Sequence, residues 1–79
     1  MKIPKNLTGK DLVTALKRLG YTQTRQRGSH IRLTTMLNGQ HHITIPNHKL
    51  LKQGTLSAII KELATHHNIE KEEVLKIIL

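Results

Sequence analysis

The feature that most constrains the fold is a pair of short runs in which apolar and polar residues alternate on either side of an Asn-Gly step. Ile31 and Leu33 precede Asn38-Gly39, and Ile43 and Ile45 follow it. A period of two is typical of a strand with one buried face, and Asn-Gly is the strongest short-range signal for a β-hairpin turn. These runs therefore predict two antiparallel strands, over residues 30–36 and 40–45.

The loop length decides which residues of this hairpin face each other. A two-residue loop would divide the apolar side chains between the two faces of the sheet. A three-residue loop over residues 37–39, with Gly39 in the left-handed conformation and a bulge, pairs Leu33 with Ile43 and keeps the apolar residues on one face. We therefore predict the second register.

This register also orients the polar residues of the hairpin. His30, Arg32, Thr34 and His42 are expected on the face away from the apolar residues, and so away from any helix packed against them. His30 is expected opposite Pro46, which ends the pairing or lies at an edge.

Helical patterns flank the strands. Thr8 is a suitable N-cap, leucines follow at helical spacing and Gly20 is suited to the C-terminal turn, which predicts a helix over residues 8–19. A β-tolerant polar run then predicts a strand over residues 21–27, ended by Gly28.

A second apolar stripe predicts a helix over residues 55–66 with Thr55 as its N-cap, and a short acidic-headed helix is expected over residues 70–78. The predicted order is α-β-β-β-α-α, an α+β fold with a three-stranded antiparallel sheet and helices on one face. We expect residues 1–79 to form one domain.

Composition narrows the cellular setting. The chain has no cysteine, which excludes disulfides and thiolate metal sites and fits a reducing cytosol. Met1-Lys2-Ile3-Pro4-Lys5 lacks the apolar core of a signal peptide, and no apolar run approaches membrane-spanning length. We expect a soluble, cytoplasmic protein with no membrane partner.

The charge is unevenly distributed. The formal net charge is +8, and residues 1–55 contain ten Lys or Arg against one acid, Asp11. Such a basic body suits a polyanion, most simply nucleic acid. The alternative is a basic, highly soluble protein without such a partner.

Among site chemistries, a metal centre is poorly supported. His41-His42 and His66-His67 are adjacent pairs, and neighbouring strand residues point to opposite faces. There is no His-Glu-x-x-His motif and no phosphate-binding glycine loop. We expect no metal and no small-molecule cofactor, and we expect these four histidines at the surface.

A histidine on a basic, exposed strand fits ribonuclease chemistry. RNA carries its own nucleophile, the ribose 2′-OH, so such an enzyme needs a general base and cations for the phosphate. His30 can titrate near neutral pH, with Arg25, Arg27 and Arg32 to hold the phosphate. From the residues alone, an incidental histidine and ordinary solvated arginines remain the alternative.

Two stretches carry a family resemblance: LTGKDLVTALKRLGYTQTRQRGSHIRL and, later, ITIPNHKLLKQGTLSAIIKEL. Their Gly-Ser-His, Pro-x-His and Lys-x-Gly-Thr-Leu-x-x-Ile elements resemble, in order and spacing, the HicA (YcfA-like) toxin family of type II toxin–antitoxin systems. The resemblance covers nearly the whole chain. It implies a fold similar to the double-stranded-RNA-binding domain, translation-independent cleavage of mRNA, and neutralisation by a HicB-like antitoxin.

The resemblance also implies site residues. The histidine of Gly-Ser-His, His30 here, is implied to be catalytic. His48, in Pro-x-His, is a candidate second group, because it would be a diagonal neighbour of His30 if the strand continued that far. A structural histidine that caps the loop before the second long helix is the equal alternative. The expected RNA-binding residues are Arg25, Arg27, Ser29, Arg32, Lys49 and Lys52. Lys49 and Lys52 are equally compatible with solvated loop lysines.

A non-catalytic RNA-binding module of similar fold is the main rival, because it also explains the charge. The two functions differ at His30, since binding alone needs no titrating group there.

Overall fold

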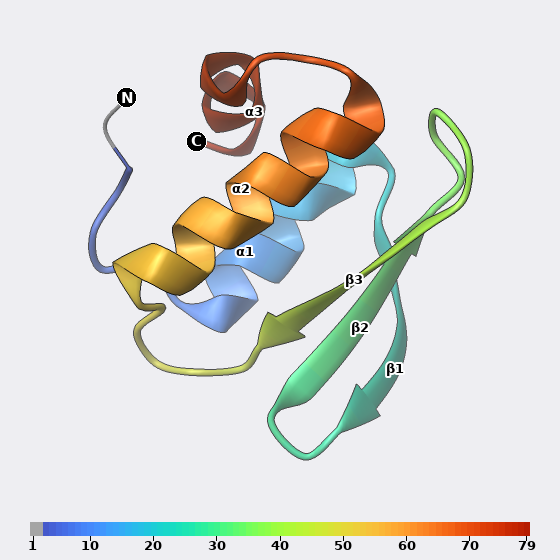
Figure 1. Cartoon of the computed structure of the whole chain (residues 1–79). Coiled ribbons are helices and arrows are strands. Elements are labelled where there is room, and N and C mark those ends of the chain that lie inside the picture. Colours follow the sequence, from blue (N-terminus) through green and yellow to red (C-terminus); the bar gives the residue numbers. More distant parts are fainter. Residues whose placement is uncertain (1–2) are drawn as a thin grey trace.

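A computed structural model describes residues 3–79; Met1 and Lys2, part of the expected leader-free start, lie outside the described residues. The observed order is α-β-β-β-α-α, which confirms the predicted α+β arrangement. The sheet is antiparallel with strand order β1-β2-β3, and the helices cover one of its faces (Figure 1). The elements are α1 (Gly9–Leu16), the 3-10 helix η1 (Lys17–Leu19), β1 (Thr22–Arg27), β2 (His30–Thr35), β3 (His41–Pro46), α2 (Gln53–His67) and α3 (Lys71–Ile78).

The first helix begins at a capping box. The Thr8 hydroxyl accepts the Asp11 backbone N–H at 2.9 Å, and the Asp11 carboxylate accepts the Thr8 backbone N–H at 3.1 Å. This bond from the Thr8 backbone lowers the pKa of Asp11 below its ordinary value. The predicted single helix tightens into η1 and ends at Gly20, whose φ of 80° is suited to glycine. Tyr21 then bonds back to Leu16 instead of joining the strand, so β1 begins one residue later than predicted.

The hairpin between β2 and β3 has the predicted register. Leu33 lies opposite Ile43, and the pairing continues to Thr35 opposite His41. The tip differs in detail, because the strands end one residue short of the predicted loop and Asn38 has a positive φ of 59° as well as Gly39. Asparagine tolerates this left-handed conformation better than most residues, which lets a wider turn close without changing the register.

The second long helix begins earlier than predicted. Thr55 is not its N-cap: α2 starts at Gln53, after Lys52 in an extended conformation and without a side-chain cap. Two tertiary hydrogen bonds fix the preceding chain, from Leu51 N–H to the Leu7 carbonyl and from the Gln53 side chain to the Pro4 carbonyl. The helix therefore starts where the chain leaves these contacts, and a local cap signal could not reveal that point.

The core lies between the sheet and the helices. Ile31, Leu33, Ile43 and Ile45 form its strand side and are buried, as predicted. The helices add the apolar residues Leu12, Ala15, Leu16, Leu19, Leu56, Ile59, Ile60 and Leu63, and α3 adds Val74, Leu75 and Ile78. No helix within residues 3–79 is long and apolar enough to span a bilayer. One face of the sheet is thereby closed by the helices, and the opposite face is left open to solvent.

Candidate functional site

The Gly-Ser-His element forms the turn between β1 and β2. Arg27 pairs with His30, so Gly28 and Ser29 are the two turn residues between them. Gly28 has a φ of 56°, and glycine at the first turn position suits the two-residue turns that match strand twist. The Ser29 carbonyl also accepts a hydrogen bond from Asn47 N–H at 2.6 Å. This turn places His30 as the first residue of the central strand.

We use the name outer face for the side of the sheet opposite the helices. Because Ile31 and Leu33 are buried, their neighbours on β2 point to this face. Cross-strand pairing then forms three rows along it. They are Arg27, His30 and Pro46; Arg25, Arg32 and Thr44; and, nearest the hairpin tip, Thr22, Thr34 and His42.

A β-bulge at Thr24 determines which way the β1 arginines point. Gln23 pairs with Leu33, and the next recorded pair is Arg25 with Arg32, so Thr24 is an extra residue. Regular pairing from Gln23 onward would have set Arg25 opposite Ile31, on the face that the helices cover. The bulge therefore brings Arg25 and Arg27 onto the same face as His30.

The outer face is cationic and carries no acidic side chain. Between Asp11 and Glu62 the chain contains no Asp or Glu, so the strands contribute only positive charge. Within residues 3–79 the recorded ion pair is His41 with Glu62, which lies on the opposite side of the sheet. The outer-face arginines are thus available to an external anion.

His30 is exposed, and its imidazole makes no hydrogen bond within the part of the chain described. Its backbone is nevertheless held from both sides, by Arg27 and by Pro46. A free imidazole on a fixed backbone, among guanidinium groups, can accept or donate a proton next to a bound phosphate.

The remaining predicted site residues lie beyond this face. β3 ends at Pro46, so His48 is not the strand neighbour of His30 that a longer strand would have made it. Its carbonyl instead accepts the Gly9 N–H at 2.9 Å, and its side chain lines a hollow of about 290 Å³ beside Lys49. Lys49 and Lys52 are exposed in the connection to α2. No recorded hydrogen bond joins these three side chains to His30.

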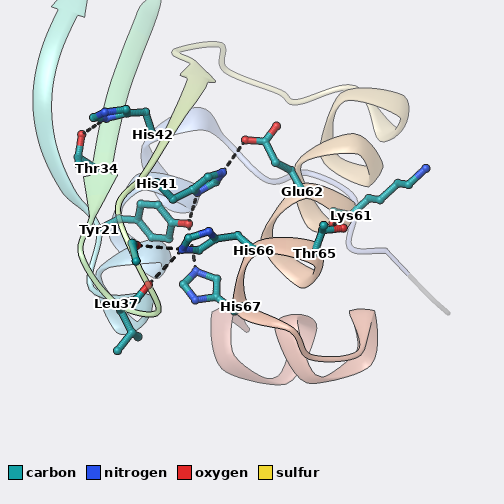
Figure 2. Close-up of polar contacts among 11 residues, drawn as sticks. Tyr21, Thr34, Leu37, His41, His42, Lys61, Glu62, Thr65, His66 and His67 are labelled. Atoms are coloured by element: carbon teal, nitrogen blue, oxygen red, sulfur yellow. Dashed lines mark hydrogen bonds and ion pairs between the residues drawn. The ribbon is translucent and has the colours of Figure 1, made fainter.

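The expectation that the four paired histidines lie at the surface was wrong for His67, which is buried, whereas His41 and His66 are half-buried. These three gather with Tyr21 between the hairpin tip and the end of α2 (Figure 2). His67 is 6% exposed and Tyr21 is 1% exposed. Of the four histidines expected at the surface, His42 is the one that is exposed, and it points away from this cluster on the outer face.

The hydrogen bonds of this cluster run in one direction. The Glu62 carboxylate can only accept, so the His41 Nε2–H donates to it at 3.0 Å and leaves Nδ1 to accept from the Tyr21 hydroxyl at 2.6 Å. Tyr21 in turn accepts from His67 Nε2–H at 3.0 Å, and His67 Nδ1 accepts from the Asn38 amide at 3.1 Å. With neutral imidazoles, both ring nitrogens of His41 and both ring nitrogens of His67 therefore have a hydrogen-bond partner.

The electrostatics favour the same protonation states. Burial lowers the pKa of His41, as does the neighbouring His66, while Glu62 acts in the opposite direction. Burial and the same neighbour lower the pKa of His67. Burial raises the pKa of Tyr21 to about 12. These pKa shifts favour the neutral forms of His41, His67 and Tyr21 near pH 7.

Its geometry fits neither metal binding nor catalysis. The His41 and His66 rings stack with centroids 4.4 Å apart, so their nitrogen atoms do not converge on one point. In residues 3–79 no group of three His, Asp or Glu side chains is arranged to hold a metal ion. The Glu-His-Tyr sequence of contacts resembles a catalytic triad, but Tyr21 is too deeply buried to reach a substrate. The cluster ties α2 to the sheet.

With this geometry in place, comparison with known proteins decides the family. Residues 9–64 match the sequence model of a family described as HicA toxin of bacterial toxin–antitoxin. The chain belongs to the HicA toxin family. No curated protein and no solved structure matches it. The expected likeness to the double-stranded-RNA-binding domain therefore stays a prediction.

Membership of the HicA family makes the chain the toxin of a toxin–antitoxin pair, and so implies an antitoxin partner. The matched span runs from the start of α1 nearly to the end of α2 and includes the whole outer face. His66, His67 and α3 lie after it.

Proposed function

We propose that this HicA toxin is a metal-independent endoribonuclease that cleaves mRNA in the cytoplasm, with His30 as its general acid–base group. The observation that carries the proposal is an exposed imidazole without a protein partner on the same sheet face as three arginines. A sheet face that only had to bind RNA would need the cations but not a titrating group beside them.

The reaction needs little besides these groups. Neutral His30 takes the proton of a ribose 2′-OH, and the oxygen then attacks the adjacent phosphorus. The bond from phosphorus to the 5′ oxygen breaks, leaving a 2′,3′-cyclic phosphate, and the departing oxygen takes a proton from water or from a second group. His48 is our candidate for that group, since it follows Pro46, the cross-strand neighbour of His30.

Cations stabilise the charge that develops on the phosphate. Arg27 and Arg32 neighbour His30 and are suited to its two non-bridging oxygens, because guanidinium groups bind phosphate in a bidentate manner. Arg25 extends this charge along the face, and Ser29 can donate from the adjoining turn. Lys49 and Lys52 are assigned to phosphates further along the strand of RNA.

The antitoxin partner is proposed to be a HicB-like protein that covers the outer face. Acidic side chains would complement Arg25, Arg27 and Arg32, which lack acidic partners in this chain. Covering this face excludes RNA and His30 from contact at the same time.

The test is His30→Ala, assayed for folding, RNA binding and cleavage on one preparation. Because the side chain is exposed and unbonded, unfolding free energy should change by less than about 0.5 kcal/mol. Cleavage should fall by at least about a hundredfold, which is the lower range for loss of a general acid–base group. RNA binding should persist and should weaken steeply with salt, as phosphate contacts do.

Thr44→Ala is the matched control, because Thr44 is exposed on the same face and its side chain makes no recorded hydrogen bond. It should cleave as the parent does. A folded His30→Ala protein with undiminished cleavage would refute the catalytic role, and RNA binding without any cleavage by the parent would favour the binding-module alternative.

A further inference from the structure

Near the hairpin tip, three side chains of the outer face are joined by hydrogen bonds. The Thr34 hydroxyl lies 2.7 Å from His42 Nδ1, and the Thr24 hydroxyl lies 3.0 Å from that of Thr34. These three side chains come from β2, β3 and the bulge of β1, and Figure 2 shows the His42 ring lying over the sheet beside Thr34. We call them the threonine–histidine row.

The stability of the fold does not require these hydrogen bonds. His42 is exposed and is not part of the hydrophobic core. Exposed hydrogen bonds of this kind contribute little to stability. Their effect is to hold an imidazole ring in one orientation on a basic surface.

The direction of donation along these hydrogen bonds follows from the last acceptor, the Arg32 carbonyl. The Thr24 hydroxyl donates to the Arg32 carbonyl at 3.4 Å, and a carbonyl can only accept. With that proton committed, Thr24 accepts from the Thr34 hydroxyl, and Thr34 accepts from His42 Nδ1–H. His42 then presents the unprotonated Nε2 to solvent as a hydrogen-bond acceptor.

His42 lies too far from His30 to take part in the same proton transfer. It pairs with Thr34, four residues along β2 from His30, which is roughly 13 Å at about 3.4 Å per strand residue. Arg32 lies between the two histidines on the same strand. A single strand of RNA that places a phosphate at His30 and another at Arg32 would bring a neighbouring base to His42.

The outer face also has few planar side chains on which a nucleobase could stack. Tyr21, the one aromatic residue of the chain, is buried, so imidazole and guanidinium groups provide the surfaces on which a base can stack. Stacking requires a base that is turned out from its partner, which single-stranded RNA offers and a duplex does not.

We propose that the threonine–histidine row is a nucleobase subsite for single-stranded RNA, in which His42 stacks on one base and its Nε2 accepts a hydrogen bond from the exocyclic amino group of the neighbouring base. Cytosine, adenine and guanine carry such a group, and uracil does not. The subsite rests on the proposal that the outer face binds RNA, but it does not depend on cleavage.

The experiment compares oligocytidylate with oligouridylate, in which the 4-amino group is replaced by a carbonyl and the unprotonated N3 by an N3–H. Dissociation constants are measured at neutral pH with the full chain carrying His30→Ala, so that the RNA stays intact. This parent should bind oligocytidylate more tightly. Adding His42→Ala should weaken that binding by at least about fivefold and remove the preference, because loss of one stacking partner has effects of this size.

Two further variants separate the parts of the subsite. His42→Phe keeps a stacking surface without an acceptor, so it should retain most of the affinity but lose the preference. Thr34→Val keeps the branched shape but releases the ring, so it should reduce the preference. Thr44→Ala should change neither quantity.

Each outcome has one consequence. Unchanged oligocytidylate binding in folded His42→Ala and Thr34→Val proteins, or equal binding of a duplex, would overturn the subsite while leaving the cleavage proposal intact. Equal affinity of the parent for the two oligonucleotides would refute the amino-group preference. Absence of any salt-dependent RNA binding would overturn the proposed function as well.

Discussion

At the scale of single residues, two glycines of similar helical position have opposite roles. Gly9 begins α1 where the helix touches the end of β3, and its N–H donates to the His48 carbonyl at 2.9 Å. A side chain at Gly9 would collide with the Pro46 carbonyl oxygen and lie 2.9 Å from the Asn47 Cα. Both obstacles are backbone, which cannot move aside as a flexible side chain can. Gly9→Ala should therefore destabilise the fold by about 1–3 kcal/mol, as overpacking does, measured by urea unfolding.

Gly54 provides the matched control for this prediction. It lies in the first turn of α2 with open space where a Cβ would be added, and its φ is not positive. Gly54→Ala should stabilise the protein by about 0.4–1 kcal/mol, because alanine restricts the unfolded chain. Equal effects of the two substitutions would contradict the close contact between α1 and β3.

At the scale of elements, period and loop chemistry predict the hairpin well and predict the rest of the site less well. The register of β2 and β3 follows from keeping Leu33 and Ile43 on one face, which also sends His30 outward. The bulge at Thr24 could not be predicted, because β1 is polar throughout and has no apolar alternation to reveal a change of face. The outward direction of Arg25 is therefore a finding of the structure.

The histidine cluster was likewise predictable only where local sequence determines it, and not where tertiary contacts do. Neighbouring residues of a strand point to opposite faces of the sheet, so His41 and His42 had to point in opposite directions. The inward direction of His41 could therefore have been predicted from the sequence. Its partners could not have been, because they come from the end of α2 and are brought there by packing of the helix across the sheet. Adjacent histidines on a helix carry no signal of which strand residue they will meet.

The Tyr21 hydroxyl is the link on which this contact between elements depends. It donates to His41 and accepts from His67, so Tyr21→Phe leaves two ring nitrogens without partners. A buried polar group without a partner costs about 1–3 kcal/mol, and we expect a loss of that size in unfolding free energy. Hydrogen exchange should also accelerate at the end of α2.

Thr65→Val is a suitable control, since it also removes a hydroxyl from this region. The Thr65 hydroxyl bonds to the Lys61 carbonyl within α2 and is exposed. Its loss should change stability by less than about 0.5 kcal/mol. A Tyr21→Phe protein as stable as this control would mean that the cluster does not hold α2 to the sheet.

At the scale of the whole molecule, histidines occupy two kinds of environment on opposite sides of one sheet. Those of the outer face, His30 and His42, are exposed among arginines, whereas His41 and His67 meet between the sheet and the end of α2 and have lowered pKa values. The first pair is open to solvent and to ligands. The second pair couples folding to pH.

The sign of this coupling follows from the direction of the shifts. The pKa values of His41 and His67 are lower in the folded chain than the ordinary value of 6.5, mainly because of burial. Below that value the unfolded chain binds more protons, so acid favours unfolding. The stabilising contribution is complete above pH 6.5 and is lost as the pH falls through each folded-state pKa. Tyr21 acts at the other extreme, because its contribution is lost as the pH rises from 10 through about 12.

We therefore expect the free energy of unfolding to decrease with acidification between about pH 7.5 and pH 5. His41→Gln and His67→Gln should each make this dependence shallower, because each removes one group that is neutral when folded and charged when unfolded. His42→Gln, next to His41 on β3 but exposed on the outer face, should change the dependence less than either cluster variant, because the charge of His42 is the smallest of the effects on the pKa of His41. Urea unfolding at a series of pH values measures all four proteins. If the two cluster variants kept the slope of the parent, general charge repulsion in this basic chain would explain acid unfolding, and the neutral cluster would not.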